Sequence, residues 1–286
     1  IQLEDNEDIL NHLSTVLPLA PGFAEVLGQQ EIAALIGAQP RCGGIHYLRG
    51  GWLNPQTVCR ALLAHPAITL IEGCGEVRLT PLDDQWQALD PSGNPIAEAP
   101  LAVLATAHGV TMQTALAWLP LTTIRGQTTH LPATEELSGL QVALCDSGYL
   151  PPARSGQHCM GASFVAGDPG TDERAAEHAH NVDMMRTALP DLKLRPPEAG
   201  WQGHVAHRCN SNDYLPVAGF VPDLPAFNTQ YDALRHDRKR PIDATCPAVS
   251  GFAVLTSLGS RGLSAAPLAA EARCIDAFMT GLAEFE

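Results

Sequence analysis

Two groups of residues in this chain have the types and spacing that chemistry requires. The first is a glycine-framed turn at Leu258–Gly262, between an apolar run at Phe252–Thr256 and a stretch with helical periodicity from Leu263 onward. Its two glycines permit a positive φ or a close approach to a ligand. The N–H groups and the positive dipole end of such a helix favour an anionic or electron-rich ligand. An ordinary strand-to-helix connection has the same pattern, and this alternative stays open.

The second group consists of arginines within predicted strands. Arg208 lies among apolar and small residues, just before an Asn-Ser-Asn-Asp turn. Its planar guanidinium suits a carboxylate, which belongs either to a ligand or to a structural Asp or Glu. Arg125 precedes Gly126 and Gln127 in a polar strand. A bulge there would bring Arg125 near a ligand, whereas a simple kink would leave it a surface arginine.

Other reactive residue types show no catalytic spacing. His204 and His207 lie three apart in a predicted strand and point to opposite faces, so no metal site is predicted. His178 and His180 diverge on a predicted helix and are expected to be solvated. The basic run RHDRKR at 235–240 is typical of a solvated loop, although a phosphate clamp is the alternative.

The elements that position these residues follow from periodicity and turn residues. Two short helices are expected within 6–36, broken at the prolines, and further helices at 54–63 and 171–189. A meander is expected from strands at 67–72, 76–79, 86–89 and 101–106. From residue 118 onward, polar alternation predicts an antiparallel sheet. The Gly73-Cys74-Gly75 sequence lacks the third glycine and the helix of a dinucleotide fingerprint, and that motif is rejected.

Composition bounds the class of protein. The 286 residues with 45% hydrophobic content suffice for one large or two ordinary domains. The net charge of −14 argues against general binding to nucleic acids or anionic membranes. The eight cysteines are scattered without a CxxC pair, which fits reduced thiols, and the acidic start shows no signal peptide. A cytoplasmic location is therefore expected.

Six motifs, in the same order over nearly the whole chain, carry a resemblance to a known family. They are GGWLNPQ (50–56), VLATAHG (103–109), RGQTTHLP (125–132), SGYLPP (147–152), RCNSNDYLPVAGFVPD (208–223) and LGSRGLSAAPLAAE (258–271). The chain resembles the FAD-dependent C-terminal oxidoreductase domain of the MnmC family, the bifunctional tRNA 5-methylaminomethyl-2-thiouridine biosynthesis proteins. More widely, it is similar to the glycine/D-amino-acid oxidase superfamily.

The resemblance implies FAD-dependent oxidative removal of the carboxymethyl group from 5-carboxymethylaminomethyl-(2-thio)uridine at the tRNA wobble position. Arg208 would pair with the substrate carboxylate, and Tyr149 and Arg125 would line the pocket. The remaining implied residues contact the cofactor: Gly259, Ser260, Arg261, Gly262 and Leu263 at the flavin, and Ala105, Thr106 and Ala107 along it.

The resemblance also implies an α/β fold of two interleaved domains. Residues 1–50 and 118–203 would form a substrate domain with an antiparallel sheet, and 51–117 and 204–286 a Rossmann-like FAD-binding domain. The family's first βαβ unit with its GxGxxG turn is not found in this sequence. The chain is therefore expected to be a piece that lacks this segment and the SAM-dependent methyltransferase domain, with tRNA as its partner.

Two departures from the family pattern concern the same sites. The family's Ala-Asn-Gly-His is Ala-Thr-Ala-His at 105–108, and Ser211-Asn212 replaces Thr-Arg. Two other functions stay open: an FAD-dependent oxidase of free glycine or D-amino acids, and a non-catalytic fragment without flavin.

Overall fold

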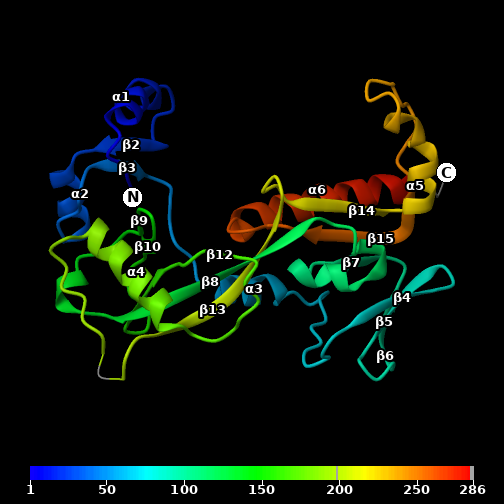
Figure 1. Cartoon of the computed structure of the whole chain (residues 1–286), viewed down its shortest axis with the longest axis horizontal. Helices are drawn as coiled ribbons and strands as arrows, with labels where there is room; N and C mark the ends of the chain where they lie inside the picture. Colours follow the sequence, from blue (N-terminus) through cyan, green and yellow to red (C-terminus); the bar gives the residue numbers. More distant parts are fainter. Residues whose placement is uncertain (198, 284–286) are drawn as a thin grey trace. The chain divides into compact units, whose positions relative to one another are not determined.

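The chain forms two compact units, each built from two separate segments. The computed structural model describes residues 1–197 and 199–283, with side chains through residue 272. Unit 1 comprises Ile1–Ala61 and Arg125–His207, and unit 2 comprises Leu62–Ile124 and Arg208–Glu286. Figure 1 shows the mixture of helices and several sheets, which confirms the predicted α/β fold class.

Most of unit 1 is organised around one nine-stranded sheet, with strand order β12-β8-β11-β10-β9-β1-β3-β2 and β13 paired to β8. The strands are β1 (Gln2–Leu3), β2 (Ala24–Leu27), β3 (Gly44–Tyr47), β8 (Leu121–Pro132), β9 (Leu144–Cys145), β10 (Tyr149–Leu150), β11 (Gln157–Gly161), β12 (Val165–Ala166) and β13 (Gln202–Ser211). The antiparallel pairing of β8, β11, β10 and β9 confirms the sheet predicted beyond residue 118.

The helices of unit 1 are α1 (Glu7–Val16), α2 (Gln29–Ile36), α4 (Ala175–Ala188) and the first part of α3 (Pro55–Leu63). Of these, α2 and α4 bury apolar side chains in the core. The core includes Ile32 and Ile36 from α2, Met185 from α4 and Leu131 from β8. Burying such side chains contributes about 1.5–3 kcal/mol each.

Two predictions for unit 1 are corrected. The stretch 6–36 holds β2 in addition to its two helices, because β2 pairs with β3 and this pairing is not visible in a local pattern. The helix predicted from residue 171 begins at Ala175 instead. The residues before it are drawn into a loop in which Arg174 pairs with Asp168 and Asp172. These contacts lower the pKa of Asp168 to about 2, with the hydrogen bond from Arg174 as the largest cause.

Unit 2 contains two three-stranded sheets. One has the order β14-β15-β7, from β14 (Val217–Pro222), β15 (Ala248–Thr256) and β7 (Ala102–Leu104), and the other is the meander of β4 (Arg78–Leu82), β5 (Gln85–Leu89) and β6 (Pro95–Ala99). Its helices are α5 (Leu224–Gln230) and α6 (Gly262–Ala283), and α6 lies along β14 (Figure 1). The predicted strand, turn and helix at the C-terminal end are confirmed.

The predicted meander of unit 2 is partly wrong. Residues 67–72 form no strand, and β7 pairs with β15 rather than with β6. Residues 95–99, for which no strand was predicted, form the third strand of the meander. The two sheets meet through the stacked rings of Trp86 and Phe252, whose centroids are 4.5 Å apart.

No helix in the described part of the chain is long and apolar enough to cross a membrane. Seven cysteines are free thiols, and the side chain of Cys274 lies outside the described residues.

Candidate cofactor and substrate site

Residues predicted to contact a cofactor lie at one edge of a parallel strand pair in unit 2. β7 and β15 run parallel, with Val254 opposite Leu104. Ala105–Ala107 and Ser257–Gly259 therefore leave the sheet at the same edge, the carboxyl ends of the strands, where α/β sheets bind ligands. The Thr256 hydroxyl donates a hydrogen bond of 2.8 Å to the carbonyl of Ala107 and ties the two segments together.

The end of β13 joins this edge through backbone and serine hydrogen bonds. The Gly259 N–H donates to the carbonyl of Cys209 at 3.0 Å. The Ser211 N–H donates to the Ser257 hydroxyl at 2.6 Å, which in turn donates to the carbonyl of Leu215 at 2.9 Å. Three segments distant in sequence thus meet at one place. Ser257 was not predicted as a site residue, and the sequence offers no signal for its role, because its partners are non-local.

Gly259 is required at its position for two reasons. Its φ is +54°, and a Cβ built there would lie 2.7 Å from Asn210 Oδ1. Asn210 is 6% exposed, and its Oδ1 has no hydrogen-bond partner among the described residues. A buried acceptor without a partner costs about 1–3 kcal/mol, so this atom marks a place where a donor is missing. The polar run after β13 was predicted only as a turn.

The first turn of α6 opens beside this acceptor. The carbonyl of Arg261 accepts from the N–H groups of Ser264 and Ala265. The N–H groups of Gly262 and Leu263 have no acceptor among the described residues, as is usual for the start of a helix. The space around Gly262 is open. Free donors, a positive helix end and a nearby buried acceptor together can hold a polar, electron-rich ring.

We predict that Gly259→Val weakens both folding and flavin binding. The added side chain meets Asn210 and adopts a left-handed conformation, which costs about 1–3 kcal/mol in the free energy of unfolding. Urea denaturation and FAD titration measure the two effects. The matched control is Gly51→Ala, because nothing lies within 4 Å of its added methyl group and Gly51 is not assigned to the cofactor. If the two variants had the same free energy of unfolding and the same affinity for FAD, the assigned role of Gly259 would be contradicted.

Arg208 lies next to this site on β13. It is half-buried, and because side chains alternate along a strand, it projects from the same face of β13 as Asn210. Arg208 belongs to unit 2, the unit that holds the predicted cofactor residues. A guanidinium in this place can orient a carboxylate beside the turn at Gly259.

Arg125, by contrast, is enclosed in unit 1. Its side chain is 0% exposed, and its Nε donates to Glu177 Oε1 at 2.8 Å. Its other donors bind the carbonyls of Gly170 and Asp172 and the Gln127 side chain. Arg125 was expected either at a ligand or on the surface, and both predictions are wrong, because it forms a buried ion pair with Glu177. Its effect on a ligand can therefore be only indirect, through the loop and helix that it holds.

A buried polar network extends from this ion pair into α4. His178 Nδ1 lies 2.8 Å from the Thr129 hydroxyl, and its Nε2 lies 3.3 Å from Glu173. Asn181 donates to the carbonyl of Gln127 at 2.9 Å. His178 is thus buried, and its predicted solvation is wrong, because α4 turns this face toward β8. The described residues contain no group of three His, Cys, Asp or Glu side chains that could hold a metal ion.

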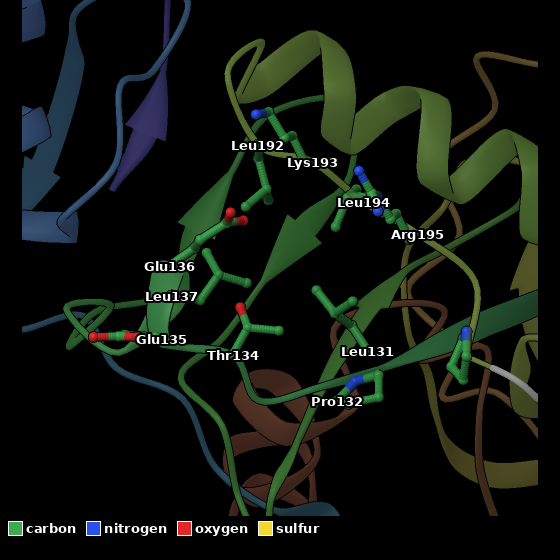
Figure 2. A pocket seen from close by; sticks show the side chains of 11 residues that line it. Leu131, Pro132, Thr134, Glu135, Glu136, Leu137, Leu192, Lys193, Leu194 and Arg195 are labelled. Carbon is green, nitrogen blue, oxygen red and sulfur yellow. The ribbon is translucent and has the colours of Figure 1, made fainter.

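Tyr149 lies in unit 1, on β10, where it pairs with Cys145 and Gly161 and stays 37% exposed. Unit 1 also contains a cavity of ≈ 480 Å³ between the segments 131–137 and 192–197. Figure 2 shows Glu136 and Leu137 on one side of it and Leu194 and Arg195 on the other. None of the predicted site residues lines this cavity.

A strand edge with a glycine turn and an open helix start is compatible with a nucleotide cofactor, and comparison with known families specifies the class of protein. The family of FAD dependent oxidoreductases (DAO) matches residues 4–273, and the chain belongs to this family.

The chain is also similar to individual proteins. It is 40% identical over 262 residues to the tRNA 5-methylaminomethyl-2-thiouridine biosynthesis bifunctional protein MnmC of Pseudomonas entomophila, covering 88% of this chain and 40% of that protein. The protein of the same name from Pseudomonas putida KT2440 is 38% identical over 257 residues, with 88% and 39% covered. The chain thus spans about 40% of the length of these relatives.

Solved structures agree with the fold. Iminodiacetate oxidase from Chelativorans sp. BNC1 has a TM-score of 0.69 at 19% identity, covering 94% of this chain and 68% of that one. Glycine oxidase from Bacillus cereus has a TM-score of 0.68 at 15% identity, covering 94% and 69%. At these identities the likeness establishes the fold alone.

Proposed function

We propose that this chain is the oxidising part of a tRNA-modifying enzyme. The reaction is the FAD-dependent removal of the carboxymethyl group from 5-carboxymethylaminomethyl-(2-thio)uridine at the wobble position. The observation that carries the proposal is that the end of β13, the strand that holds Arg208 and Asn210, meets Gly259 at one strand edge. The identity to the MnmC proteins supports the tRNA substrate, which their name states.

The residues at the strand edge fit the cofactor that the family implies. The N–H groups of Gly262 and Leu263 are donors for the electron-rich edge of a flavin, and Asn210 Oδ1 is an acceptor for a ring N–H. Ala105, Thr106 and Ala107 are exposed where β7 ends. Ser260 and Arg261 complete the turn that leads into α6. When bound, FAD would accept a hydride, which carries both electrons of the oxidation, from the methylene carbon of the carboxymethyl group.

The chain's own residues bind and orient the substrate. Arg208 pairs with the carboxylate and so fixes the methylene carbon next to it. Such positioning contributes a large part of the rate when the cofactor supplies the redox chemistry. Loss of the hydride leaves a carbon–nitrogen double bond, and water hydrolyses it to glyoxylate and 5-aminomethyl-(2-thio)uridine. We assign Tyr149 to the substrate side, on the sheet of unit 1.

We also propose that a further polypeptide segment completes unit 2. The apolar residues Ile68, Leu70 and Ile71 are exposed and unpaired within the described part of the chain. Val103 is 56% exposed on β7, an edge strand of its sheet. A parallel strand that carries the family's GxGxxG turn would pair with these segments and cover them. In this proposal unit 2 is the cofactor domain and unit 1 the substrate domain.

The experiment is the release of glyoxylate from tRNA that carries the carboxymethylaminomethyl group. It is carried out with the chain alone and with the chain plus a segment containing the GxGxxG turn from the Pseudomonas relatives. Glyoxylate in the second sample supports the function and the complementation together. Turnover of free glycine or D-amino acids in preference to tRNA would favour the alternative of an amino-acid oxidase.

A further inference from the structure

Unit 1 has a second cavity, whose walls differ from those of the cavity in Figure 2. Its volume is ≈ 500 Å³, within the range of small-ligand pockets. It is lined by Ile1, Gln2, His46, Tyr47, Leu48, Gly50, Gly51, Trp52, Gln141, Val142, Ala143 and Cys145. The cavity is therefore lined by two aromatic rings, Tyr47 and Trp52. It is also lined by three polar side chains that can form hydrogen bonds, Gln2, His46 and Gln141. None of the residues assigned above to the cofactor or substrate lines it.

Local contacts fix the Tyr47 ring and the backbone on both sides of Trp52. The Gly50 N–H donates to the carbonyl of Tyr47 at 2.9 Å and closes a turn after β3. A Cβ on Gly50 would lie 3.1 Å from that carbonyl, so the turn is tight. Phe23 contacts the Tyr47 ring edge-on, with centroids 6.0 Å apart. Asn54 caps the start of α3 by accepting from the Thr57 N–H at 2.9 Å, which fixes the chain on the far side of Trp52.

Both rings of this cavity are exposed. Trp52 is 39% exposed and Tyr47 is 42% exposed, and their neighbours Leu48 and Leu53 are exposed as well. Large apolar groups gathered on one surface mark a binding site more often than chance exposure. Aromatic faces of this kind are the platforms on which unpaired nucleobases stack.

Charge distinguishes this cavity from the one in Figure 2. The chain has 31 acidic and 17 basic residues, so most of its surface repels RNA. The cavity in Figure 2 has Glu135 and Glu136 among its walls. The aromatic cavity has no carboxylate among its lining residues. Burial also raises the pKa of the Cys145 thiol, so this side chain adds no negative charge near neutral pH.

Two arginines are associated with the segment that carries the two rings. Arg49 is exposed in the turn between Tyr47 and Trp52. The Arg154 guanidinium donates to the Thr57 hydroxyl at 3.2 Å, five residues beyond Trp52. Two carboxylates near the cavity are each paired: Glu25 lies 3.1 Å from His46 Nδ1, and Asp146, which follows Cys145, accepts from Arg41 at 2.9 Å. Cations next to stacking rings are the combination that single-stranded nucleic acids require.

We propose that this cavity, defined by Tyr47 and Trp52, binds an unstacked nucleobase from the single-stranded loop of the RNA substrate. The base stacks on Trp52, and the side chains of Gln2, His46 and Gln141 offer hydrogen-bonding groups for its edge. Arg49 contacts the adjoining phosphate. This inference rests on the tRNA substrate of the proposed function, and it adds a site for a base other than the one that is oxidised.

The test uses an unmodified anticodon stem-loop RNA as the probe, so that binding is read without oxidation. Trp52→Ala is expected to weaken binding of this RNA roughly 10- to 100-fold, the usual effect of removing one stacking platform. Trp52→Phe keeps an aromatic face and should stay within about 3-fold of the parent. Trp118→Ala is the control, because Trp118 is 45% exposed in unit 2 and its indole donates to Ala115.

Tryptophan emission gives a second, direct reading. Stacking on a base should quench the emission of the parent chain and of Trp118→Ala, but not of Trp52→Ala. Unchanged RNA affinity and quenching in a folded Trp52→Ala variant would overturn the proposal. Quenching of Trp52 by the methyltransferase part of a relative, with none by RNA, would also overturn it and identify a protein-docking surface. Because no modified uridine is present, failure of the oxidation assay leaves this result unaffected.

Discussion

Replacing Arg208 with methionine is expected to lower kcat/KM for tRNA carrying the carboxymethylaminomethyl group by about two orders of magnitude or more. A bidentate arginine–carboxylate pair consists of two charge-assisted hydrogen bonds, each contributing about 1.5–3 kcal/mol. Their loss removes the group that orients the reacting methylene. Methionine keeps much of the volume of the side chain, so the fold should persist. Steady-state glyoxylate release, with far-UV circular dichroism as the check on folding, measures both.

The control for this variant is Arg235→Met. Arg235 is 68% exposed in unit 2 and pairs with Asp232 at 3.6 Å, so its loss should leave kcat/KM unchanged. A folded Arg208→Met enzyme with parental activity would remove the carboxylate role. Arg208 would then belong with the structural ion pairs, the alternative that the sequence left open.

The second large effect is expected on stability, at Glu177. Glu177 is 7% exposed, and it binds Arg125 and the hydroxyl of Ser163. Glu177→Ala leaves the fully buried Arg125 guanidinium without its counter-charge, and such a loss costs about 3–5 kcal/mol in the free energy of unfolding. Urea denaturation measures it. The loop that Arg125 holds through the carbonyls of Gly170 and Asp172 should open as well, which hydrogen exchange would detect.

Asp183→Ala on the same helix is the matched control. Asp183 is exposed and pairs with Arg186 at i, i+3, an arrangement that contributes about 0.2–0.5 kcal/mol. If Glu177→Ala and Asp183→Ala lost the same stability, the buried network would not hold α4 against β8. The variant Glu177→Gln keeps an acceptor for Arg125 and should fall between the two.

The sequence predicted the elements whose signals are local. The apolar run at Phe252–Thr256, its glycine turn and the following helix were found because period, turn residues and length agree within one stretch. The helix at Pro55–Leu63 was found for the same reason, since Asn54 and Pro55 mark its start.

The predictions that failed share one cause: each depended on a partner element that is distant in the sequence. A strand exists only where a ladder forms, so Ala24–Leu27 was missed and the apolar stretch 67–72 was wrongly predicted. Burial of His178 and Arg125 depends on how α4 meets β8, and no local pattern reports it. The residues of the cofactor site were suggested by the family resemblance, and their assignment to FAD stays a prediction.

We assign flavin-dependent oxidation to the strand edge at Gly259 and Arg208, and one measurement tests this assignment most directly. The chain, together with the segment that carries the GxGxxG turn, is titrated with FAD and then mixed anaerobically with tRNA bearing the carboxymethylaminomethyl group. We predict saturable perturbation of the flavin spectrum, followed by bleaching and one glyoxylate per flavin reduced. A flavin that binds and is bleached by glycine or D-amino acids but not by the tRNA would contradict the proposed substrate. Absence of any flavin binding would contradict the cofactor site itself.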